Sequence, residues 1–174
     1  MTATTDLELV PMRIAKVAGF APPLADTERH FVVLEEVSGD RQLAVEIGQA
    51  EAFSLAARLQ GLAFGRPRIY EFTAALVQSL GGQLSEVRID RLEDGAIAAT
   101  AVLQGPIGTR PVDARASDAL NLAAQAGAPV VVSPAVLADY DQRLEDEDVA
   151  AGANLLRLAL TVPPMKITRA GGGA

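Results

Sequence analysis

The sequence contains no cysteine, no tryptophan and only one histidine, His30. The lack of cysteine excludes disulfides, thiolate zinc sites and cysteine nucleophiles. A Ser-His-Asp triad would have to use His30, and any metal would have to be held by carboxylates, which favours Mg²⁺, Mn²⁺ or Ca²⁺ over zinc. Because His30 follows Glu28 and Arg29 at the start of an expected strand, we predict that it is a surface residue rather than a ligand.

Aromatic and basic residues are both scarce. Aromatic residues make up 4% of the chain and hydrophobic residues 49%, so Ala, Val, Leu and Ile must fill the core and few rings can stack on bases. The net charge is −7, and part of it lies in the acidic stretch 139–148, which is typical of a solvated face. Nucleic-acid binding needs clustered Lys and Arg, so this balance disfavours a nucleic-acid partner, although a local arginine cluster stays open.

Long apolar runs are missing as well. No run approaches the roughly 20 apolar residues that a membrane span needs. The first eight residues are polar and acidic, whereas a signal peptide would need a basic region followed by an apolar run. We therefore expect a cytoplasmic protein without a membrane partner.

The hydrophobic pattern predicts a single α+β domain of mainly antiparallel strands, with about four helices packed on the sheet. Asp94-Gly95 predicts a turn between two of the strands. The expected strands are 12–20, 30–37, 41–47, 84–90, 96–103, 109–114 and 129–132, and the expected helices are 50–62, 70–80, 117–126 and 134–144.

The two ends of the chain differ in composition from the middle. We expect a flexible N-terminus over 1–9, one folded domain over 10–145, and an acidic start followed by a mostly disordered tail over 146–174. The tail carries Pro163-Pro164 and three consecutive glycines, with one amphipathic patch at 155–162.

Three motifs stand in order at strand-to-helix boundaries. They are Ile47-Gly48 followed by Glu51-Ala52, then Arg66-Pro67, then Asp113-Ala114-Arg115-Ala116-Ser117-Asp118. With these motifs, the segment from Val10 to Leu137 resembles the bacterial bifunctional nuclease family. The resemblance implies a nuclease that hydrolyses phosphodiester bonds of DNA or RNA, with Mg²⁺ or Mn²⁺ as the metal if it is catalytic.

The chain departs from the family pattern at two places. The family has Arg-Pro-Leu-Thr-His-Asp-Leu where this chain has Arg-Pro-Arg-Ile-Tyr-Glu-Phe at 66–72, so Tyr70 stands in place of the histidine and Glu71 in place of the aspartate. Ala116 stands in place of a proline in the third motif. These departures favour an alternative, in which the chain is a catalytically degenerate member that acts as a regulatory or scaffold anion-binding module.

Phosphodiester hydrolysis needs groups that activate water, neutralise charge and hold the phosphate. Asp113, Asp118 and Glu71 are the candidates for catalysis and for holding a metal. The candidates to bind the substrate phosphate are Arg66 and Arg115, through bidentate hydrogen bonds, and Ser117, at a helix N-terminus where anions bind well. Tyr70 is the candidate replacement for the family histidine.

The same residues also suit structural roles. Ser117 and Asp118 are favourable at any helix start, Asp113 can pair with an arginine, and Glu51 opens a helix where the dipole favours acids. Tyr70 can simply pack. In addition, a domain rich in Ala, Val and Leu leaves an apolar face or a sheet edge to cover, and we expect a homodimer.

Overall fold

The computed structural model describes residues 8–22, 25, 27–93, 96–146 and 150–168. The predicted turn at Asp94-Gly95, residues 1–7 of the predicted flexible N-terminus and residues 169–174 of the predicted tail lie outside these ranges. No helix in the described part of the chain is long and apolar enough to span a membrane.

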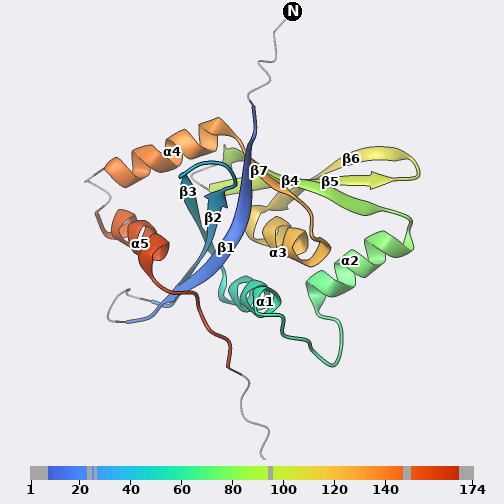
Figure 1. Ribbon diagram of the computed structural model, residues 1–174, viewed down its shortest axis with the longest axis horizontal. Coiled ribbons are helices and arrows are strands. Elements are labelled where there is room, and N and C mark those ends of the chain that lie inside the picture. Colours follow the sequence, from blue (N-terminus) through green and yellow to red (C-terminus); the bar gives the residue numbers. More distant parts are fainter. Residues whose placement is uncertain (1–7, 23–24, 26, 94–95, 147–149, 169–174) are drawn as a thin grey trace, which may run out of the picture.

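The described strands form one seven-stranded sheet, with the order β3-β2-β1-β7-β4-β5-β6. Neighbouring strands are antiparallel except for the parallel pair of β7 and β4. In Figure 1 the β1–β3 strands run steeply across the view, whereas β4, β5 and β6 lie nearly level, so the sheet is strongly curved. The strands are β1 (Val10–Phe20), β2 (Arg29–Glu36), β3 (Gln42–Ile47), β4 (Gln83–Glu93), β5 (Ala96–Gly105), β6 (Gly108–Arg115) and β7 (Val130–Val132).

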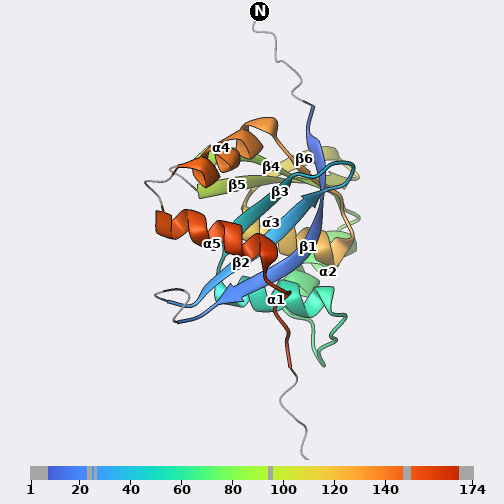
Figure 2. The ribbon, with the colours of Figure 1, turned by 60° about the vertical axis from the view of Figure 1, so that its left-hand side comes forward.

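Five helices of the described chain cover this sheet, which confirms the predicted α+β class. One group packs together through α3, which contacts both of its neighbours in the group, and the other two helices pack on each other and on β2, β3 and β4. Figure 2 shows these two groups on opposite sides of the strands. The first group is α1 (Gln49–Leu59), α2 (Ile69–Ser79) and α3 (Ala116–Ala126), and the second is α4 (Pro134–Glu145) and α5 (Ala150–Thr161).

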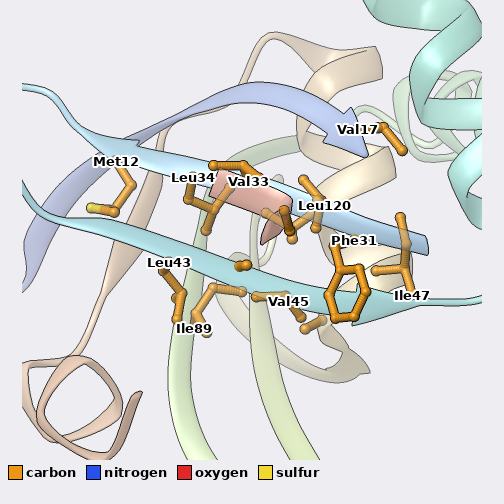
Figure 3. Close-up of a cluster of buried hydrophobic side chains, with 14 of the residues drawn as sticks. Met12, Val17, Phe31, Val33, Leu34, Leu43, Val45, Ile47, Ile89 and Leu120 are labelled. Carbon is orange, nitrogen blue, oxygen red and sulfur yellow. The ribbon is translucent and has the colours of Figure 1, made fainter. Parts of the chain in front are cut away.

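The core lies where the two halves of the curved sheet face each other. Leu43 of β3 and Ile89 of β4 are both fully buried there, together with Leu120 of α3 (Figure 3). As predicted, the core is built mainly from aliphatic side chains, with Phe31 as one of its few rings. This packing fixes the start of α3 against both halves of the sheet.

Part of the segment that was predicted to be a mostly disordered tail forms a helix. Residues 150–161 form α5, in which Leu155 and Ala159 are buried. The Lys16 ammonium donates hydrogen bonds to the carbonyl oxygens of Leu160 (2.9 Å) and Val162 (2.5 Å), at the end of the helix. The proline and glycine content of the tail suggested disorder, but the amphipathic patch within it finds an apolar surface on β2 and β3.

The prediction that His30 lies on the surface is wrong. Its side chain is only 5% exposed, because β1 and β3 flank it, and the side chains of His30 and Met165 both lie beside Gly19 of β1. Its Nε2 lies 3.3 Å from Glu28 Oε1. His30 is therefore a core residue with one exposed polar neighbour.

Candidate functional site

The third sequence motif forms the junction between β6 and α3. β6 ends at Arg115, which is the N-cap residue of α3 with extended backbone angles, and Ser117 and Asp118 lie in the first turn. Within the described chain, no side chain makes a capping hydrogen bond at this helix start. The motif therefore presents an arginine, an aspartate and backbone N–H groups at one helix N-terminus.

Four side chains from three helix starts meet at this junction, and we call them the Arg115 cluster: Glu51, Tyr70, Arg115 and Asp118. The Arg115 guanidinium donates from Nε to Asp118 Oδ2 (2.8 Å) and from Nη2 to Asp118 Oδ1 (3.2 Å) and Glu51 Oε1 (2.9 Å). The Tyr70 hydroxyl donates to Asp118 Oδ1 at 2.6 Å. The cluster thus joins α1, α2 and α3 through one hydrogen-bonded network.

Burial differs sharply within the Arg115 cluster. The Arg115 side chain is 70% exposed, whereas those of Asp118 and Glu51 are 38% and 18% exposed. Behind them the buried Asn121 amide donates to the backbone carbonyls of Glu51 (3.1 Å) and Ser117 (3.0 Å). Asn121 therefore joins the backbones of α1 and α3 behind the cluster, and the arginine faces solvent.

The hydrogen bonds of the cluster set its protonation states. Partial burial alone would raise the pKa of Asp118, but hydrogen bonds from Arg115 and Tyr70 outweigh it and place the pKa below its ordinary value. Burial, and then the hydrogen bond to Asp118, raise the pKa of Tyr70 above its ordinary value. The hydrogen bonds to Asp118 also raise the pKa of Arg115. At neutral pH the cluster holds an ionised aspartate, a protonated tyrosine and a charged arginine.

Three of the predicted site residues, Tyr70, Arg115 and Asp118, meet in this network, and Ser117 lies beside them at 9% exposure. Sequence reasoning treated Glu51 only as a helix-opening acid, although it stands in the first motif. It also missed Asn121, because the only signal in the sequence is that this residue is polar and lies on an otherwise apolar helix face. The polar contacts of both residues bridge α1 and α3, and this bridging becomes visible only once the two helices are packed.

The other predicted site residues do not join the Arg115 cluster. Asp113 pairs with Arg91 on the outer strands and is 83% exposed. The Glu71 carboxylate accepts the backbone N–H of Arg68 at 2.6 Å, which stabilises the first turn of α2. Arg66 lies exposed in the connection between α1 and α2.

The residues predicted to hold a metal were Asp113, Asp118 and Glu71. Over the described residues, no group of three or more His, Asp or Glu side chains is arranged to hold a metal ion. The two acids that do approach each other, Glu51 and Asp118, are bridged by Arg115. These side chains therefore do not form a site for a resident divalent metal.

A cavity of about 680 Å³ opens beside the cluster. Its walls come from β2, β3, β5, the start of α3, α4 and α5, and it includes Arg115 and Ser117. Gly48, the N-cap residue of α1, also lines it, so residues from the starts of two helices border the same space. Arg29 and Arg143 lie at its edge, paired with Glu46 and Asp139.

Comparison with known proteins identifies the family of this chain. The family model of the bifunctional nuclease domain matches residues 32–145, and the chain belongs to that family. Similar uncharacterized proteins occur in two strains of Mycobacterium tuberculosis, CDC 1551 and H37Rv. Each is 37% identical over 116 residues, which cover 67% of this chain and 69% of the relative.

Proposed function

We propose that this protein is a nuclease that hydrolyses phosphodiester bonds of DNA or RNA at the Arg115 cluster. The observation that carries the proposal is the exposed Arg115 guanidinium, fixed between two acids at the mouth of a cavity. Membership of the bifunctional nuclease family supports the same reaction class.

Arg115 and the start of α3 are suited to hold the phosphate. Among the described contacts of Arg115, the hydrogen bonds come from Nε and Nη2, so Nη1 is available to a phosphate oxygen. The first N–H groups of a helix lack intrahelical acceptors and favour an anion. Because these donors are fixed before substrate binds, they would also stabilise the charge that develops on the phosphate during the reaction.

Asp118 is the group suited to position the attacking water. It is ionised at neutral pH and can accept a proton from water as the water oxygen bonds to phosphorus. The leaving oxygen then departs and takes a proton from solvent. Tyr70 fills the position of the family histidine, and because it stays protonated it holds Asp118 rather than acting as the base.

A second candidate function is anion binding without turnover. It is favoured by the separation of the acids predicted to be catalytic, since Asp113 and Glu71 are engaged elsewhere. The low pKa of Asp118 also makes it a weak base. In this role, the same arginine and helix start would bind a phosphate group for regulation or scaffolding.

A cleavage assay separates the two candidates. Labelled single- and double-stranded DNA and RNA would be incubated with the wild type and with Asp118→Asn, in Mg²⁺, Mn²⁺ or EDTA. The nuclease proposal predicts cleavage that falls by a factor of about 100 or more in the variant. Equal cleavage by both proteins would reveal a contaminant and contradict it. No cleavage, combined with a thermal shift by phosphate that Arg115→Ala abolishes, would establish the second candidate.

A further inference from the structure

The cavity beside the Arg115 cluster is much larger than a phosphate group. Its volume of about 680 Å³ lies within the range of small-molecule sites, roughly 300 to 1,000 Å³. Most of its lining residues are apolar, and they come from both halves of the sheet and from the second helix group, with Val45, Ile97, Val136 and Leu156 as examples. Figure 2 shows β3, α4 and α5 close together on this side of the molecule.

Tyr140 of α4 is a buried polar group in the cavity wall. Its side chain is 3% exposed, and its hydroxyl has no hydrogen-bond partner among the described residues. The backbone of Ala44 lies nearby without completing a hydrogen bond of normal geometry. A buried hydroxyl without a partner is unfavourable, so this group is available to donate a hydrogen bond to a ligand in the cavity.

The polar groups of the cavity favour a negative charge at one end. Arg115, Ala116 and Ser117 at the start of α3 line the space, where the positive end of the α3 dipole favours an anion, whereas the Glu51 carboxylate already lies against Gly48 at the start of α1. Arg29, Arg143 and Arg115 are each paired with acids, but among the described contacts of Arg115 its Nη1 makes no hydrogen bond and is available to an anion. Most of the remaining lining residues are apolar.

We propose that this cavity is a binding site for a small amphipathic anion. The acidic group of the ligand meets Arg115 and the α3 N-terminus, the apolar body fills the space between β3, β5 and α4, and an acceptor atom takes the hydrogen bond of Tyr140. The acidic group is a carboxylate or a phosphate, because both suit a guanidinium and a helix start. The site shares Arg115 and the α3 N-terminus with the proposed nuclease site, but the proposal does not depend on cleavage, because occupancy of the cavity is measured without nucleic acid.

Calorimetric titration with four probes tests the chemistry of the ligand. The probes are octanoate, octyl phosphate, 1-octanol and inorganic phosphate. We expect one molar equivalent of octanoate or octyl phosphate to bind, at least tenfold more tightly than octanol and inorganic phosphate. The preference between the two anions identifies the acidic group. Equal binding of all four probes, or of none, would overturn the proposal.

Variants locate the binding in the cavity. Ile97→Trp places a large ring on the half-buried cavity wall and should abolish binding, whereas Ile107→Trp, at a position that is 77% exposed in the β5–β6 connection, should not. Tyr140→Phe keeps the ring and removes only the hydroxyl, so it should weaken binding several-fold while the Tm stays equal or rises. A lower Tm with unchanged affinity would show that the hydroxyl is structural and would overturn its assignment to the ligand.

Discussion

At the scale of single residues, the protein is distinguished by an ionised aspartate that two partners hold at a helix start. Asp118 accepts hydrogen bonds from Tyr70 and Arg115, and Arg115 in turn binds Glu51. The exposure of Arg115 limits its contribution to stability, since exposed ion pairs are worth about 0 to 1 kcal/mol. Substitution of Arg115 should therefore change activity more than it changes the free energy of unfolding.

The depressed pKa of Asp118 predicts a pH-dependent contribution to stability. Because the folded-state pKa lies below the unfolded value of about 4, the contribution is present above pH 4 and is lost as pH falls through the folded-state pKa. Asp118→Asn should lower the free energy of unfolding by about 1 kcal/mol at pH 7, discounted for partial exposure.

Urea unfolding at pH 7 and at the lowest pH where the fold persists measures this difference, which should shrink at the lower pH. Asp113→Asn is the matched control, because the Asp113 carboxylate is 83% exposed and its loss should change stability little at either pH. A deficit in Asp118→Asn that is the same at both values would contradict the assigned pKa direction.

Residue environments were only partly predictable from sequence. In the third motif, Arg115, Ser117 and Asp118 lie together because a strand end and a helix start fix their spacing. The burial of His30 was not predictable, since it depends on the strands β1 and β3 that flank it in the folded sheet. The separation of Asp113 from Asp118 also had no local signal. It depends on Arg91, which lies two strands away on β4.

At the scale of elements, α5 is the part of the fold that sequence reasoning missed. Strands and helices up to residue 145 were predicted close to their observed bounds, because their apolar periodicity is interrupted by glycine, proline or capping residues. The assignment of α5 depends instead on surface that β2, β3 and α4 provide after they fold. Composition alone could not reveal that surface.

Lys16 should be a main anchor of α5. Its ammonium satisfies two carbonyls at the helix end, where a positive charge also complements the helix dipole. Lys16→Met should lower the free energy of unfolding by about 1 to 2 kcal/mol and accelerate hydrogen exchange in α5. Lys166→Met removes an exposed lysine nearby and serves as the control. Equal exchange rates in α5 of both variants would show that Lys16 does not anchor the helix.

At the scale of the whole molecule, α2 leaves an apolar stripe uncovered. None of its residues is buried in the described chain, and its exposed apolar residues recur at helical spacing: Ile69, Phe72, Leu76 and, at its C-cap, Leu80. The sheet also has an open edge at β6, which is exposed along most of its length. An apolar stripe and an open strand edge are surfaces that proteins commonly cover by association.

We propose that a second copy of the chain covers this stripe in a homodimer. Light scattering coupled to gel filtration should give twice the mass of one chain for the wild type, and about the mass of one chain for Phe72→Glu with Leu76→Glu. Val37→Glu, which adds a charge at another exposed apolar position, should remain dimeric. A monomeric wild type would contradict the proposal.

The central claim is that Arg115, and not arginine charge in general, holds the scissile phosphate. Arg91 provides a matched comparison, since it also lies among carboxylates but outside the Arg115 cluster. The direct measurement is the cleavage rate of one labelled oligonucleotide by the wild type, Arg115→Ala and Arg91→Ala. We predict a loss of about 100-fold or more for Arg115→Ala and less than about threefold for Arg91→Ala. Equal losses in the two variants, or full activity in Arg115→Ala, would contradict the account.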